Sequence, residues 1–100
     1  MNERYPIPKA MMDRIIEDAA EQAGVGSAAV HIVLAQAVTW PDGGLGCPEP
    51  GMLYTQQVVE GFWVQLEVDG QLFDYRATSR GHFRRCMAND ALPGMPSQAV

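Results

Sequence analysis

The chain has 100 residues, of which 47% are hydrophobic and 19% are charged, and its formal net charge at pH 7 is −5. This size and balance are typical of one globular domain, and they argue against a multidomain enzyme, a coiled coil or a membrane-spanning chain. Because the net charge is negative, we expect no nucleic acid among its partners. The first residues lack the apolar run of a secretory leader, so a cytoplasmic location is the default expectation.

The first predicted element is a helix over residues 8–23. Its apolar positions recur at helical spacing: Met12, Ile15, Ile16, Ala19, Ala20 and Ala23. Pro8 suits the first helical turn, where its missing N–H costs no hydrogen bond. Gly24 suits the left-handed conformation that often ends a helix.

Residues 30–40 predict a strand. Large apolar side chains alternate along it: Val30, Ile32, Leu34, Val38 and Trp40. The residues between them include further apolar or small ones, such as Val33, Ala35 and Ala37. This pattern indicates a strand that is central in its sheet or covered on both faces.

Residues 40–57 predict a long irregular loop. Three prolines and four glycines lie between Trp40 and Gly51, and residues 49–52 fit a type II turn. Long loops of this kind are disproportionately functional.

Several side chains of this loop have the composition of a binding site, in which a large apolar body is combined with a few polar groups. The candidates are Trp40, Asp42, Leu45, Tyr54 and Gln56. The alternative is that Trp40, Leu45 and Tyr54 only cap one end of the core.

A β-hairpin is predicted over residues 62–77, with Asp69-Gly70 as its two-residue turn. This turn places four pairs on the core face: Val68–Gln71, Leu66–Phe73, Val64–Tyr75 and Phe62–Ala77. The other face then carries Trp63–Arg76, Gln65–Asp74 and Glu67–Leu72, with Arg76 over the Trp63 ring as a cation–π contact. A short last strand is expected over residues 83–87.

These elements predict an α+β fold with one N-terminal helix packed on a small, mainly antiparallel sheet of three to four strands. We expect one domain over residues 1–87 and a disordered tail over residues 88–100, where periodicity is lost.

One extended pattern runs from the loop to the last cysteine. It consists of Trp40-Pro-Asp-Gly-Gly-Leu-Gly-Cys-Pro-Glu-Pro-Gly51, then Tyr54-Thr55-Gln56, then the hairpin and finally Cys86. It resembles a family of small bacterial proteins of unknown function, over roughly residues 10–86, in which Cys86 takes the place of a closing cysteine. The resemblance implies a fold and no reaction. Members of that family often look exported or lipid-anchored, so export is the second expectation for location.

The residues leave two interpretations of Cys47 and Cys86 open. In the first, both cysteines are unpaired. In the second, they form a disulfide that anchors the loop. Closing a loop of roughly 40 residues stabilises a fold by about 4 kcal/mol in the chain-entropy model.

Cys47 as a nucleophile is a separate hypothesis. It needs His31 or His82 nearby to lower its pKa, and Asp42 to orient that histidine. A metal site made by both cysteines and both histidines lacks the closely spaced ligand pairs of structural zinc sites, so we expect no metal and no cofactor.

The arginines are unevenly distributed. No Lys or Arg lies between Ile15 and Tyr75, and four arginines then follow within ten positions: Arg76, Arg80, Arg84 and Arg85. The favoured interpretation is a solvated turn whose arginines neutralise the helix or Asp74. The alternative is an edge that recognises anions, since the arginine fork suits carboxylate and phosphate.

The function favoured by these features is a non-catalytic binding or interaction module that presents loop 40–57 to an unknown protein or small ligand. A pre-ordered loop loses less entropy on binding. The alternatives are a thiol-dependent enzyme centred on Cys47 and a protease-inhibitor-like module.

Overall fold

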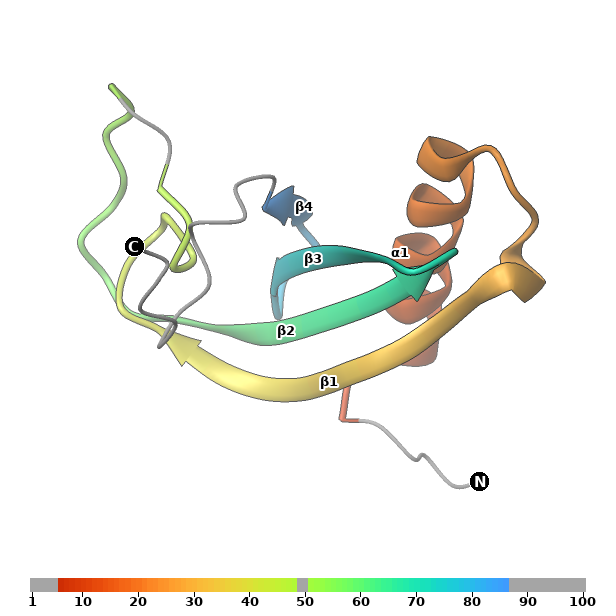
Figure 1. The fold of residues 1–100 in the computed structure, drawn as a ribbon. Coiled ribbons are helices and arrows are strands. Elements are labelled where there is room, and N and C mark those ends of the chain that lie inside the picture. Colours follow the sequence, from red (N-terminus) through yellow and green to blue (C-terminus); the bar gives the residue numbers. More distant parts are fainter. Residues whose placement is uncertain (1–5, 49–50, 87–100) are drawn as a thin grey trace.

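The structure, a computed structural model, describes residues 6–48 and 51–86. Helix α1 (Lys9–Ala23) is followed by a short 3-10 turn (Ser27–Ala29) and by four strands: β1 (Val30–Trp40), β2 (Val59–Val68), β3 (Gln71–Thr78) and β4 (Phe83–Cys86). The strands form an antiparallel sheet in the order β1-β2-β3-β4 (Figure 1). The predicted α+β fold is confirmed.

Three expectations fall wholly or partly outside the described residues. They are the tail over residues 88–100, the last residue of the predicted strand 83–87, and the first two residues of the predicted turn 49–52. Within the described ranges, α1 is the one α-helix, and it is neither long nor apolar enough to cross a membrane.

Helix α1 packs on one face of the sheet, which we call the helix face. Ile15 and Ala19 are fully buried there against strand residues such as Val64, Leu66 and Tyr75. The helix ends at Gly24, which has φ 73° and donates backbone hydrogen bonds to the carbonyls of the last turn. Alanines on this side of α1 let the helix approach the sheet closely.

The hairpin of β2 and β3 has the predicted register. Asp69 and Gly70 form its tip with φ 53° and 79°, the left-handed values that a two-residue hairpin turn requires. All seven predicted cross-strand pairs are present, from Val68–Gln71 to Phe62–Ala77.

Strand β1 differs from the prediction. It lies at the edge of the sheet, and exposed residues such as Val33 and Gln36 alternate with half-buried ones, so the expectation of a central or doubly covered strand is wrong. The register shifts between Ile32, opposite Leu66, and Leu34, opposite Gln65. Val33 is therefore the extra residue of a β-bulge, which moves the following side chains to the other face.

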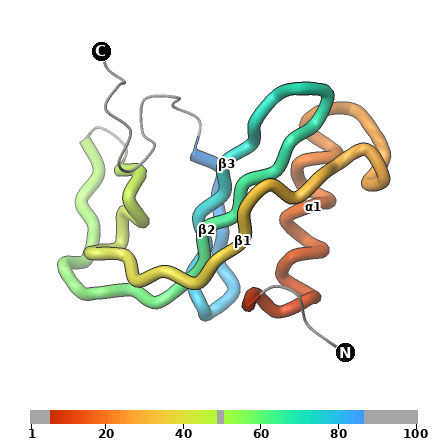
Figure 2. Tube along the Cα trace, turned by 60° about the horizontal axis from the view of Figure 1, so that its bottom comes forward, coloured from red at the N-terminus to blue at the C-terminus, as the bar shows by residue number. Residues whose placement is uncertain are grey.

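The bulge explains why the apolar alternation of β1 is misleading. Val30 and Ile32 lie on the helix face, whereas Leu34, Val38 and Trp40 lie on the opposite face. We call this opposite face, which also carries Trp63, Asp74 and Arg76, the loop face. Figure 2 shows α1 and the loop after β1 on opposite sides of the strands.

Candidate functional site

A disulfide joins the loop to the sheet. Cys47 lies in the loop and Cys86 ends β4, and their Cα atoms are 6.1 Å apart. Of the two interpretations that the residues left open, the structure has the bridged one, with both side chains buried. In this form Cys47 has no thiol to act as a nucleophile, and neither sulfur is available as a thiolate ligand for a metal.

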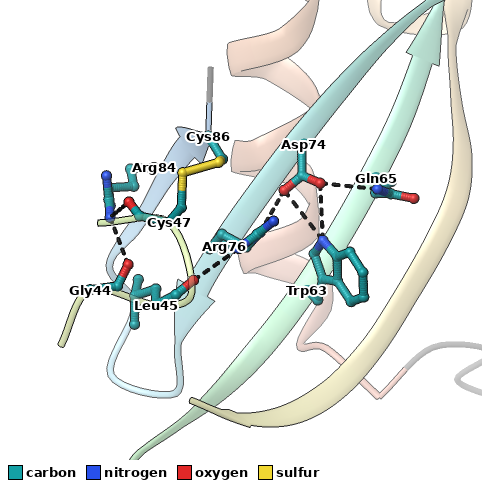
Figure 3. The surroundings of a disulfide bond; sticks show 9 residues. All are labelled: Gly44, Leu45, Cys47, Trp63, Gln65, Asp74, Arg76, Arg84 and Cys86. Carbon is teal, nitrogen blue, oxygen red and sulfur yellow. Dashed lines mark hydrogen bonds and ion pairs between the residues drawn. A yellow bond between two sulfur atoms is a disulfide. The ribbon is translucent and has the colours of Figure 1, made fainter. Parts of the chain in front are cut away.

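Two arginines donate hydrogen bonds to the stretch of the loop around Cys47, residues 44–47, which we call the loop base. Arg76 and Arg84 are neighbours across β3 and β4 on the loop face. Arg76 Nη1 donates to the carbonyl of Leu45 at 3.0 Å, and Arg84 Nη2 donates to the carbonyls of Gly44 at 2.8 Å and Cys47 at 2.6 Å (Figure 3). Backbone carbonyls in a tight loop turn inward with no strand partner, and guanidinium donors satisfy them.

Arg76 is itself held by a buried polar cluster. Its Nε donates to Asp74 at 2.6 Å, and the same carboxylate accepts hydrogen bonds from Trp63 at 3.1 Å and Gln65 at 3.0 Å (Figure 3). The guanidinium of Arg76 lies 5.3 Å from the rings of both Trp40 and Trp63, so the predicted cation–π contact is present and a second one accompanies it. Arg76 has no exposed surface, which places it in the interior rather than in a solvated turn.

Residues 42–47 form a tight turn under this cluster. The side chain of Asp42 accepts a hydrogen bond from the backbone N–H of Gly44 at 2.8 Å, and Cys47 N–H donates to the carbonyl of Gly44 at 3.0 Å. Leu45 and Gly46 have φ 57° and 71°, which reverses the chain. Asp42 thus shapes its own loop, as short acidic side chains commonly do in turns.

The five predicted binding residues divide into two groups. Trp40 and Leu45 are buried, and Trp40 Nε1 donates to the carbonyl of Ala77 at 3.1 Å, so these two cap the sheet. Asp42 and Tyr54 are half-buried, and Gln56 is exposed. The loop therefore both closes the loop face and keeps part of its surface accessible.

The accessible part is an extended stretch over residues 51–58, which we call the exposed arm. Leu53 is 95% exposed, and Met52 and Val58 are more than half exposed. The aromatic and polar pattern of the loop did not single out these residues. The signal that was available is an apolar pair, Met52-Leu53, inside a proline- and glycine-rich segment that has no strand periodicity to bury it.

Beside the exposed arm lies a groove with a volume of about 520 Å³, within the range of ligand-binding pockets. One wall is the chain leading into β2, and the other is the turn between β3 and β4. Its polar lining includes Thr55, Glu60, Thr78, Ser79, Arg80 and His82. Backbone hydrogen bonds from Gly43 to Thr55 and from Ser79 to Glu60 fix its walls.

The other two of the four arginines, Arg80 and Arg85, lie in different surroundings. Arg80 is exposed at the rim of this groove. Arg85 lies on the helix face, 3.9 Å from the centroid of the Phe73 ring, and donates to the side chain of Gln22 at 2.9 Å. The structure thus distributes the four arginines over a buried ion pair, a loop anchor, a groove and the helix face.

The two histidines lie in different elements of the fold. His31 is in β1 opposite Glu67, and His82 is in the turn between β3 and β4. Within residues 6–48 and 51–86, no three His, Cys, Asp or Glu side chains gather closely enough to hold a metal ion.

The sequence matches a known family model. The family model described as "Domain of unknown function (DUF8738)" matches residues 12–86, which include α1, the loop, the hairpin and both cysteines. No curated protein and no solved structure matches the chain.

Proposed function

The chain belongs to the family described as a domain of unknown function (DUF8738), and we propose that it is a non-catalytic binding module that presents loop 40–57 as a preformed surface. The observation that supports this is a contrast within the loop. Its base is held by the Cys47–Cys86 bridge and by hydrogen bonds from Arg76 and Arg84, while Leu53 on the exposed arm is 95% exposed.

A rigid base under an exposed apolar arm favours binding. Ordering a loop costs free energy at the moment of association, and a loop that is already anchored avoids part of that cost. Met52, Leu53 and Val58 supply apolar area, and the half-buried Tyr54 and exposed Gln56 supply polar groups beside it. The partner that suits this composition is a protein with an apolar pocket for Leu53.

We infer that the protein is bacterial, as the resemblance implies, and that it works outside the reducing cytosol. The buried disulfide supports the second inference, since such bonds persist mainly in oxidising compartments. This replaces the default cytoplasmic expectation with the exported location that the family resemblance implied.

The test is a selection of peptides from a display library on the oxidised full-length protein, followed by affinity measurements on the selected peptides. Leu53→Asp should weaken their binding at least tenfold, which is about 1.4 kcal/mol. Leu72→Asp is the matched control, because Leu72 is also apolar and exposed but lies in β3 near the hairpin tip. Peptides that bind both variants equally would show that the arm is not the working surface.

A protease-inhibitor-like module is the second candidate. It is favoured by the position of Leu53, an exposed apolar side chain on an extended segment between the disulfide-linked Cys47 and β2. This candidate predicts inhibition of a protease that prefers leucine, with the chain left intact and the inhibition lost in Leu53→Gly. Rapid cleavage at the arm would instead contradict it.

The thiol-enzyme alternative is tested by thiol titration without reductant. The bridged structure predicts no reactive thiol in the native protein. A fast-reacting Cys47 near neutral pH would restore this alternative and count against a disulfide-anchored loop.

A further inference from the structure

We propose that the free edge of β1 is a self-association surface, through which the β1 strands of two copies pair antiparallel about a two-fold axis at Gln36. This proposal is independent of the binding function of loop 40–57. It rests on the strand's position, length and sequence.

Strand β1 is an open edge. In the part of the chain that the structure describes, its one strand neighbour is β2, so backbone N–H and C=O groups along its other side have no strand to pair with. The strand has 11 residues, about twice the usual strand length. A long edge of this kind is a template for pairing with another chain unless charges, proline or bulges block it.

The residues of β1 do not block it. Its sequence, VHIVLAQAVTW, contains no Asp, Glu, Lys, Arg or Pro, whereas each of the other three strands carries at least one charged residue. The bulge at Val33 interrupts the strand near its start and leaves Leu34–Trp40 as an uninterrupted paired stretch.

The opposite edge of the sheet, strand β4, is protected from pairing with another chain. Strand β4 has four residues, two of them arginines, and it ends in the disulfide. Arg84 of this strand donates to the loop that lies over it. Within the same sheet, the β4 edge is therefore short, charged and covered by the loop, whereas the β1 edge is long and uncharged.

The absence of charged residues in β1 lowers the electrostatic cost of pairing two copies there. Two chains of net charge −5 repel each other, and an uncharged strand is the place where they approach with the least opposition. An antiparallel pair with Gln36 on the axis sets Leu34 against Val38 and Ala35 against Ala37 of the other copy. These apolar pairs lie on matching faces, which is the arrangement that stabilises neighbouring strands.

The surface beside this edge is also uncovered. A hollow of about 340 Å³ runs along the end of β1. It is lined by Ala37, Val38 and Thr39 of β1, by Glu60, Gly61 and Phe62 of β2, and by Ser79. A second copy paired at Gln36 would lie next to this hollow. The bulge at Val33 limits the stretch that pairs symmetrically about Gln36 to Leu34–Val38, so the interface is small although the strand is long. We expect a dissociation constant on the order of 10 µM.

The experiment is sedimentation velocity of the oxidised full chain over a concentration range from roughly 1 to 500 µM, where mass action should convert monomer into dimer. Gln36→Lys and Gln36→Glu each set like charges against each other on the axis, and each should raise the dissociation constant at least tenfold. An equimolar mixture of the two variants should recover association, because opposite charges then face each other. Gln36 is exposed, so both variants should keep the fold, which circular dichroism checks.

The matched controls are Leu72→Lys and Leu72→Glu, which change the net charge equally on an exposed residue of β3. They should leave the dissociation constant within about twofold of the natural chain. A monomer at every concentration overturns the proposal. So does a dimer that is indifferent to the charge at Gln36, or a mixture of Gln36→Lys and Gln36→Glu that stays monomeric.

Discussion

Removing the Cys47–Cys86 disulfide is expected to lower the free energy of unfolding by about 4 kcal/mol. The bridge spans a sequence separation of 39 residues. In the chain-entropy model a closed loop of that length restricts the unfolded chain by about 13 cal/mol/K, which is about 3.9 kcal/mol at 25 °C. Since a domain of this size has a total stability of roughly 5–15 kcal/mol, the loss is a large share of it.

The assay compares three states of the protein by urea unfolding, followed by tryptophan fluorescence. They are the oxidised natural chain, the same chain in reductant, and the double variant Cys47→Ala/Cys86→Ala. Trp40 reports on the anchored loop because it is the last residue of β1, where the loop begins, and Trp63 reports on the sheet because it lies within β2. The reduced chain and the double variant both lack the bond and should unfold at similar urea concentrations, well below the oxidised chain.

The reasoning is refuted if reduction lowers the free energy of unfolding by less than about 1 kcal/mol. In that case the hydrogen bonds from Arg76 and Arg84 would be sufficient to hold the loop base. A double variant much less stable than the reduced chain would instead assign the loss to packing of the buried sulfur atoms.

Two further predictions concern buried polar groups. Asp74→Asn removes the carboxylate that pairs with fully buried Arg76, and it should lower the free energy of unfolding in urea by about 3–5 kcal/mol. Asp13→Asn, which breaks an exposed pair, should lower it by less than about 1 kcal/mol. Equal losses in the two variants would contradict the burial argument. Burial raises the pKa of Tyr75 above its usual value, and the hydrogen bond to Asp18 and that residue's charge raise it further. The neutral phenol therefore contributes stability that is fully present below about pH 10, the pKa of tyrosine in the unfolded chain, and that is lost as the pH rises toward the pKa in the folded protein. The variant Tyr75→Phe should therefore lose less stability than the natural chain between about pH 9 and 11.5. Parallel losses in the two proteins would refute this.

The hairpin was predictable because two local signals agree. Strict alternation identifies the two strands, and Asp69-Gly70 fixes the turn, so the register follows without knowledge of the rest of the fold. The position of α1 follows in the same way from its apolar spacing and from Gly24.

The burial of Arg76 was harder to predict, although its parts were present. Asp74 and Arg76 are two positions apart and so share one face of β3, opposite Gln65 and Trp63. What the sequence did not indicate is that the loop folds back over this face and excludes water from the ion pair. A buried charge becomes tolerable only when such a cover supplies partners for its remaining donors, as the carbonyl of Leu45 does here.

The bulge at Val33 connects these features. Without the extra residue, Trp40 would lie on the same face as Ile32 and would join the helix face. With it, Trp40 lies on the loop face over Arg76, and the chain leaves β1 on the side where Arg84 and Cys86 anchor the loop base. The same bulge marks where the uninterrupted free edge begins. One inserted residue therefore places both surfaces proposed here, the exposed arm at one end of β1 and the self-pairing stretch along it.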